Sequence, residues 1–282
     1  MRSPHELIND NLELVALPEL VLKLNQMVED PRCSANDIAN VIMQDVSLSA
    51  HLLQIANSPF YSLPAKVDSV SMAITIIGTR QLKDMILATT IVNHFQAIPA
   101  DLVPISQFWQ HNIACATATR VIARLINNRN QERFFLAGLL HDIGKLVMYF
   151  AEPGLSRQVI EQAAASEESL NQLEQKIFGF THSDIGAELL RQWQFPESLI
   201  EPVLKHHAPD QASQYRAETA ATHLANAVAN TLRPIISLDD DLPIDPDVWS
   251  YLGLSESTLD TIINETSSNI GHAFDVLYMQ AA

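Results

Sequence analysis

The stretch Phe134–Phe150 reads FFLAGLLHDIGKLVMYF, an apolar segment interrupted by His141, Asp142 and Lys145. An apolar segment of this length predicts a helix in the core. Burying an imidazole and a carboxylate side by side is costly unless both are paired, so this doublet requires a partner or a function. Neighbouring helical side chains diverge by about 100°, which lets His141 and Asp142 flank one cation without competing for space.

Further histidines accompany this doublet along the chain, at His111, His182, His206 and His207. Any one of them alone would suit a hydrogen-bonded histidine of the core. As an ordered set together with the His-Asp doublet, they favour a shared site over chance placement.

Outside this segment the sequence also predicts helices. The chain has only 8 glycines, and its apolar residues recur at three-to-four spacing. No alternating pattern bounded by hairpin turns predicts a strand, so we expect an all-α protein. The predicted helices cover residues 34–43, 48–55 (with Asp45 as N-cap), 70–77, 81–94, 106–125, 133–150, 155–166, 169–178, 183–194, 198–207 and 217–232, with one or two more in 255–276.

The stretch Gln96–Pro104 contains two prolines and lacks periodicity, which indicates a boundary between two parts of the chain. We expect an N-terminal helical subdomain over residues 1–98 and a second helical subdomain over residues 99–282. Residues 234–246 are rich in Asp and Pro and predict an exposed loop. Its run Asp239–Asp241 lacks the spaced ligands and the turn glycine of a calcium loop, so a solvated acidic turn is favoured.

Composition narrows the class of protein. The chain of 282 residues is 47% apolar, which suits a globular protein with a large core. A net charge of −16 and no run of basic residues argue against nucleic-acid binding. No uncharged apolar run reaches the roughly 18 residues that span a bilayer, so we expect no membrane association. Two cysteines are too few for a disulfide framework and favour a cytoplasmic location.

A second motif lies upstream, where Gln44–Tyr61 joins a helix to the turn Asn57-Ser58-Pro59. This motif resembles the signature of HDOD proteins, the HD-related output domains of bacterial signalling. The resemblance continues through Val70–Gly78, Arg80–Lys83, Phe108–His111, Leu136–Lys145, His182–Ala187, Trp193, Pro196 and His206-His207.

The resemblance implies an N-terminal helical bundle packed on a C-terminal subdomain with the HD fold. It also implies a regulatory module of bacterial signal transduction that binds signalling proteins, with a nucleotide as a further candidate ligand. Such domains are usually without demonstrated catalysis. The alternative is a divergent metal-dependent HD phosphohydrolase acting on a nucleotide or a cyclic dinucleotide.

By the same resemblance, a divalent metal ion would be held at His111, His141, Asp142, His182, His206 and His207, with Lys145 placed to contact a phosphate. One position departs from the enzymes, because Asn226 stands where they carry an Asp that closes the site. The Gly-Tyr-Pro segment of cyclic-di-GMP phosphodiesterases is also missing after His207. Two readings stay open: a bound metal, or a buried hydrogen-bonded network that orders the helices. Both require that these side chains and Asn226 converge.

Overall fold

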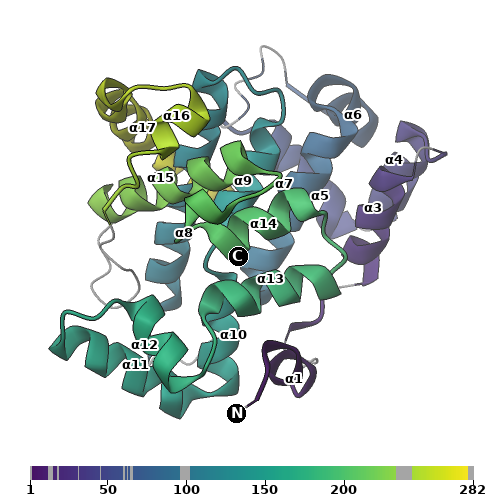
Figure 1. The fold of residues 1–282 in the computed structure, drawn as a ribbon. Helices are drawn as coiled ribbons and strands as arrows, with labels where there is room; N and C mark the ends of the chain where they lie inside the picture. The colour runs from purple at the N-terminus through teal and green to yellow at the C-terminus, as the bar shows by residue number, and fades with distance from the viewer. Residues whose placement is uncertain are drawn as a thin grey trace. The chain divides into compact units, whose positions relative to one another are not determined.

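The computed structural model describes residues 2–11, 15–17, 19–30, 32–44, 46–59, 61, 63, 66–95, 102–232 and 243–278. Every regular element within these residues is helical, with no strand among them (Figure 1). The predicted all-α class is therefore confirmed. The predicted cap Asp45, most of the predicted boundary at 96–104 and most of the acidic loop at 234–246 lie outside the described residues.

The α-helices are, in chain order, α1 (Pro4–Asn9), α3 (Glu19–Glu29), α4 (Ala35–Met43), α5 (Val46–Ala56), α6 (Val70–Ile77), α7 (Thr79–His94), α8 (Ile105–Leu125), α9 (Gln131–Leu140), α10 (Ile143–Ala151), α11 (Pro153–Ala165), α12 (Leu170–Ile177), α13 (His182–Gln192), α14 (Glu197–Lys205), α15 (Arg216–Leu232), α16 (Val248–Leu252) and α17 (Leu259–Leu277). The described residues also include two short 3-10 helices, η2 (Pro209–Gln211) and η3 (Glu256–Thr258).

The chain divides into two compact units. Unit 1 comprises Met1–Ala16 and Phe95–Ser268, and unit 2 comprises Leu17–His94 and Asn269–Ala282. This division differs from the predicted limits of 1–98 and 99–282 at both ends of the chain. The N-terminal residues fall in unit 1 because α1 packs on α13 and α10.

Unit 2 is a bundle built from α3 to α7. Its core contains Leu24, Ile38, Ile42, Leu52, Ala73, Ile74, Leu82 and Ile86. A capping box opens α4 at Ser34, with Asp37 as its reciprocal partner. At the turn after α5, Asn57 donates to Leu53 O and Val67 O and accepts from Val67 N, at 2.7–2.8 Å. Asn57 thus closes the end of the helix and fastens the next segment to it.

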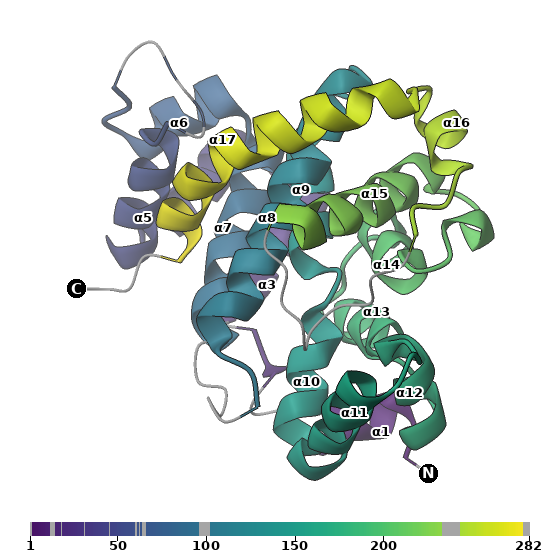
Figure 2. The ribbon, with the colours of Figure 1, turned by 90° about the vertical axis from the view of Figure 1, so that its left-hand side faces the viewer.

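Unit 1 holds the predicted site. Its centre is the packing of α8 against α9 and α15, which lie side by side in Figures 1 and 2. Gly138 of α9 lies close against α8: a Cβ at this position would be 2.9 Å from Ala116 Cα and from Cys115 O. After the end of α9 the chain turns into α10, which packs on α13.

The prediction of one continuous helix over residues 133–150 is wrong in one detail, since α9 ends at Leu140 and α10 begins at Ile143. Asp142 has φ −104° and ψ 7°, outside the α-helical region, so the helix cannot continue through it. The break sits at the His-Asp doublet itself. His141 Nε2 lies only 3.4 Å from Asp142 Oδ2, so the two side chains do not diverge as they would on a helix.

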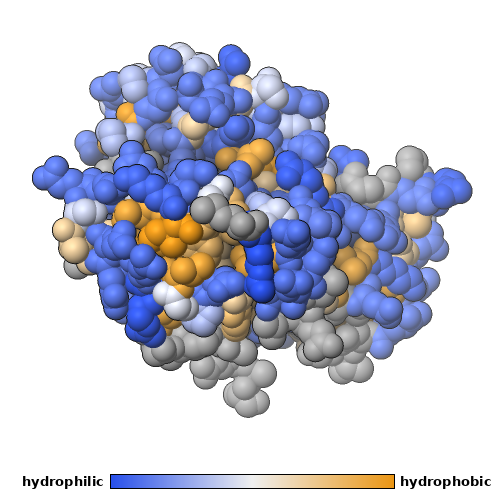
Figure 3. All heavy atoms as spheres, turned by 60° about the horizontal axis from the view of Figure 1, so that its bottom comes forward, coloured by the Kyte–Doolittle hydropathy of each residue, from blue (hydrophilic) through white to orange (hydrophobic). Residues whose placement is uncertain are grey.

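The segment Gln131–Ala151 is apolar and long enough to cross a membrane by composition alone, contrary to our expectation from the sequence. However, 89% of its most apolar window is buried inside the structure, as in the core helices of globular proteins. The face drawn in Figure 3 is mostly hydrophilic, with its largest group of apolar atoms left of the centre and smaller groups above the centre and to the right.

One carboxylate anchors the start of α15 and provides a test of the fold. Glu201 accepts hydrogen bonds from the backbone N–H groups of Ser213, Gln214 and Tyr215, and from the Ser213 hydroxyl. Burial raises the pKa of Glu201, but these bonds outweigh it and hold the pKa below its ordinary value of 4.5. Because the folded-state pKa is depressed, this stabilisation is present above pH 4.5 and is lost as the pH falls through the folded-state pKa.

We therefore expect Glu201→Ala to lower the free energy of unfolding by about 1–2 kcal/mol at pH 7, and by progressively less below about pH 4. Urea unfolding at several pH values measures this difference. Glu161→Ala, at an exposed position of α11, is the control and should change stability by less than about 0.5 kcal/mol. A cost for Glu201→Ala that is independent of pH would contradict the role of the charge.

Candidate metal centre

The predicted site residues lie on five different parts of unit 1, and the structure brings them together. His111 projects from α8, and His141 and Asp142 form the break between α9 and α10. His182 is the first residue of α13, whose N-cap is Thr181. His206 and His207 follow the end of α14, and Asn226 projects from α15.

Four of these side chains form what we call the four-ligand group: Asp142, His182, His206 and His207. His182 Nε2 lies 3.2 Å from Asp142 Oδ1, 3.4 Å from His206 Nε2 and 3.0 Å from His207 Nε2. His206 Nε2 lies 3.8 Å from Asp142 Oδ1. Asp142, His182 and His206 are at most 1% exposed, and His207 is half-buried.

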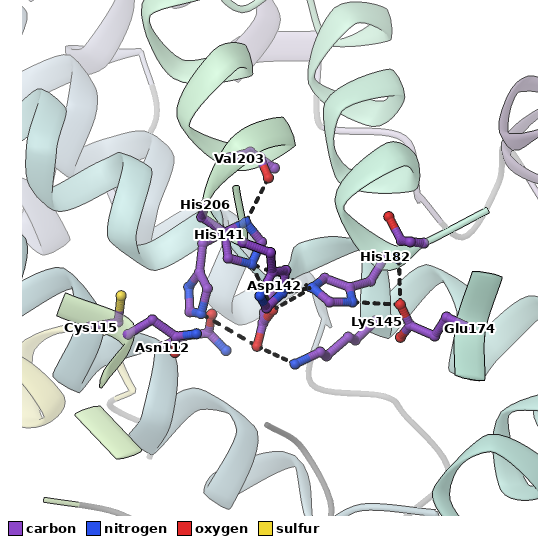
Figure 4. A network of polar contacts seen from close by, with 12 residues as sticks. Asn112, Cys115, His141, Asp142, Lys145, Glu174, His182, Val203 and His206 are labelled. Carbon is purple, nitrogen blue, oxygen red and sulfur yellow. Dashed lines mark hydrogen bonds and ion pairs between the residues drawn. The ribbon is translucent and has the colours of Figure 1, made fainter. Parts of the chain in front are cut away.

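The imidazoles in this cluster are oriented by their other ring nitrogen. His141 Nδ1 donates to Gly138 O at 2.8 Å, and His206 Nδ1 donates to Val203 O at 2.7 Å. His182 Nδ1 donates to Glu174 at 2.7 Å. Each Nε2 is thereby directed toward Asp142, as the close view shows (Figure 4). A hydrogen bond at one ring nitrogen fixes which nitrogen faces a ligand, as in metal sites of proteins.

His111, His141 and Asp142 form a second set, which we call the three-ligand group. It shares Asp142 with the first group, and the rings of His111 and His141 lie 5.4 Å apart between centroids. Within this set His111 Nε2 is 3.0 Å from Asn226 Oδ1, so the amide oxygen accepts its proton. Asn226 therefore supplies a neutral acceptor to His111 rather than a carboxylate charge to the cluster.

Lys145 brings a positive charge into the same interior. Its Nζ lies 2.8 Å from Asp142 Oδ2, and the whole residue is 1% exposed. The sequence resemblance placed Lys145 as a phosphate contact, whereas in the structure it makes an ion pair with Asp142. Because one oxygen of Asp142 faces Lys145 and the other faces His182, the carboxylate is engaged on both sides.

Burial and neighbouring charges act differently on two of the histidines. Burial lowers the pKa of His182, but the carboxylates of Glu174 and Asp142 raise it, and the net direction is upward. Burial lowers the pKa of His206 well below its ordinary value, and repulsion from His141 and His182 lowers it further. His206 is thus held as a neutral imidazole, which is the form that binds a metal.

Two contributors were missed by sequence reasoning. Glu174 is 2% exposed and accepts from both the backbone N–H and Nδ1 of His182. Its position was detectable, because it interrupts the apolar stripe Leu170, Leu173, Ile177 of α12. His223 donates from Nδ1 to His206 O and accepts at Nε2 from Asp245 N, and burial lowers its pKa. Nothing in the sequence around His223 distinguishes it from an ordinary core histidine.

The donors present fit a divalent cation. Atoms held about 2.0–2.2 Å from one ion lie roughly 2.9–3.6 Å from each other. The three separations from His182 Nε2, at 3.0, 3.2 and 3.4 Å, fall in that range, whereas the separation between His206 Nε2 and Asp142 Oδ1, at 3.8 Å, lies slightly above it. Three imidazoles and one carboxylate are a donor set typical of zinc and other first-row metals.

Comparison with known proteins identifies the family of this chain. The chain belongs to the HDOD domain family, whose model matches residues 14–209. The match includes the His-Asp doublet, His182, His206 and His207, whereas Asn226 and the C-terminal helices lie beyond it.

Solved structures share the fold at low sequence identity. An HDOD domain protein of unknown function from Geobacter sulfurreducens is 24% identical, with a TM-score of 0.75, over 95% of this chain and 98% of its own. A candidate phosphohydrolase from Shewanella amazonensis SB2B is 21% identical, with a TM-score of 0.74, over 96% and 97% of the two chains. A candidate signal transduction protein from Marinobacter aquaeolei VT8 is 21% identical, with a TM-score of 0.74, over 96% of this chain and 61% of its own.

A relative known from its sequence is an uncharacterised protein of Treponema pallidum (strain Nichols), 23% identical over 271 residues. The match covers 93% of this chain but spans about half the length of that relative, 50%. At these identities the structural likenesses establish the fold alone.

Proposed function

We propose that this chain is a regulatory module of bacterial signal transduction that acts by binding protein partners and not by turnover. In this proposal the four-ligand group holds one divalent cation as part of the folded core. The cytoplasm is the proposed location, because its signalling partners would be found there. A nucleotide is a secondary candidate ligand.

The observation that carries the proposal is the closure of the cluster. Structural cation sites are typically filled by four protein donors, whereas catalytic sites keep one position open for water or substrate. Here Asp142, His182, His206 and His207 offer four donors, and the first three are at most 1% exposed. Lys145 engages the remaining oxygen of Asp142 at 2.8 Å. Of the four donors, His207 alone is more than 1% exposed.

Membership of the HDOD family and the name of the Marinobacter aquaeolei structure support the signalling role. Asn226 adds to this, because its pairing with His111 leaves the three-ligand group without a further carboxylate. In phosphohydrolases a cation activates water and neutralises the phosphoryl oxygens. The cation must therefore be accessible to water and to the substrate.

The test is a hydrolysis panel on the full chain loaded separately with Zn²⁺, Mn²⁺ and Mg²⁺. The panel comprises bis-p-nitrophenyl phosphate, nucleoside triphosphates and cyclic dinucleotides, and His207→Ala serves as the site variant. We expect the rates with the wild-type protein to equal those with His207→Ala and with buffer containing the metal alone. Turnover that depends on the metal and is abolished by His207→Ala would overturn the proposal.

The second candidate is a divergent metal-dependent phosphohydrolase. The observation that favours it is the nitrogen and oxygen donor set itself, together with a lysine close to the cation position. The name of the Shewanella amazonensis structure points the same way for that protein. The same panel separates the two functions, since only the enzyme would release product.

A further inference from the structure

A buried carboxylate outside the predicted site holds one of the candidate ligands. Glu174 lies on α12 and is 2% exposed. Its Oε2 accepts from His182 Nδ1 at 2.7 Å and from the His182 backbone N–H at 2.8 Å. Both bonds converge on the same oxygen, so the carboxylate fixes the ring and the backbone of one residue together (Figure 4).

The position of His182 makes this arrangement favourable. His182 is the first residue of α13, so its N–H points out of the helix N-terminus, where a negative charge is stabilised. The N-cap Thr181 and its capping-box partner Asp184 satisfy other groups of this terminus. Glu174 accepts the hydrogen bond from the backbone N–H of His182, the candidate ligand itself.

The consequence lies on the opposite side of the ring. Because Nδ1 carries the proton donated to Glu174, Nε2 is the nitrogen available to the cluster. That nitrogen is the centre of the four-ligand group, with three donor atoms within 3.4 Å of it: Asp142 Oδ1, His206 Nε2 and His207 Nε2. A carboxylate hydrogen-bonded to the distal nitrogen of a ligating imidazole raises its basicity and holds its orientation.

We propose that Glu174 is the positioning residue of the cation site: by holding the Nδ1 proton of His182, it directs Nε2 at the cation and sets the affinity of the four-ligand group. This inference rests on the proposed cation and adds a residue that the family resemblance did not indicate. Glu174 contributes no donor atom of its own to the cluster.

The other two Nδ1 protons are held differently. Those of His141 and His206 are accepted by the main-chain carbonyls of Gly138 and Val203, which no side-chain substitution removes. Among His141, His182 and His206, only the orientation of His182 depends on a side chain, which a substitution can remove. A substitution at Glu174 therefore changes how His182 is oriented while all four candidate ligand residues stay in place.

The experiment compares Glu174→Gln and Glu174→Ala with the wild-type full chain, using isothermal titration with Zn²⁺ after removal of metal by a chelator. Glu174→Ala should weaken Zn²⁺ binding by about 10–100-fold, and Glu174→Gln, which keeps an acceptor but not the charge, by less. Glu132→Gln is the control, since Glu132 is a buried carboxylate paired with Arg120 at 3.9 Å outside the cluster. It should leave the Zn²⁺ affinity unchanged even if it lowers stability.

A second readout follows the proton directly. Nitrogen NMR of ¹⁵N-histidine protein should show His182 protonated at Nδ1 both with and without Zn²⁺, and should show Nε2 shifting on Zn²⁺ addition. In Glu174→Ala the Nδ1 preference should be lost, whereas a purely structural role would leave it unchanged.

Three results would overturn the inference: unchanged Zn²⁺ affinity in folded Glu174→Ala, a proton on Nε2 alone of His182 in the wild type, or a wild type that binds no Zn²⁺. The third would also remove the cation from the proposed function, while its regulatory part, which the hydrolysis panel tests separately, would stand. Conversely, metal-dependent hydrolysis would overturn the regulatory proposal without affecting the role of Glu174.

Discussion

Asp142→Ala is expected to lower the free energy of unfolding by about 3–5 kcal/mol in the presence of a chelator, one of the two largest effects predicted for this protein. Asp142 is 1% exposed and lies 2.8 Å from Lys145 Nζ, and Lys145 is itself 1% exposed. Removing the carboxylate leaves an ammonium group buried without its counter-charge, which is far more costly than removing a whole ion pair. Urea unfolding followed by circular dichroism measures the effect.

The double variant Asp142→Ala, Lys145→Met is the matched control. It removes both charges and keeps an apolar side chain of similar length at position 145, so at least half of the lost stability should return. Equal destabilisation of the single and double variants would show that the pairing of Asp142 with Lys145 is not the source of the cost.

Gly144→Ala is expected to destabilise the protein by about 3 kcal/mol or more, because the added Cβ meets main-chain atoms that cannot rotate away. That Cβ would lie 2.0 Å from His182 O and 2.7 Å from Gly186 N. The substitution would therefore push α10 away from the start of α13, where His182 enters the cluster. We expect a lower thermal midpoint and weaker Zn²⁺ binding.

Gly154→Ala provides the control at an equivalent position, since Gly144 and Gly154 are each the second residue of a helix. Apart from its chain neighbours and the backbone of its own helix, no atom lies within 4 Å of a Cβ at Gly154. Because alanine is the better helix former, this variant should be as stable as the wild type or about 0.5–1 kcal/mol more stable. Equal stability of the two glycine variants would contradict the claim that close packing around position 144 requires a glycine.

The sequence predicted most of the helices because their apolar residues keep a helical period and their ends carry recognisable caps. Ser34 with Asp37 is one such cap, and Asn57 at the end of α5 is another. The His-Asp doublet was also visible, since two polar residues in an apolar segment need a reason. What the period could not show is the break at Asp142, because the residues on both sides continue the helical pattern.

The rest of the site depends on contacts between distant parts of unit 1. Glu174 meets His182 eight residues later only because α12 turns back on the start of α13, and His223 meets Asp245 across 22 residues. The pairing of Lys145 with Asp142 is local in sequence but requires the turn geometry between α9 and α10. The family resemblance therefore indicated the candidate ligands, whereas the residues that orient them required the structure.

The metal content of the full chain shows most directly whether the four-ligand group holds a cation. The protein would be expressed in medium supplemented with zinc and manganese, exchanged into metal-free buffer and measured by inductively coupled plasma mass spectrometry. His182→Ala combined with His206→Ala serves as the control, since it removes two donors of the four-ligand group. We expect one equivalent of divalent metal per wild-type chain and none in the double variant. A wild type without metal, or equal metal in both proteins, would contradict it.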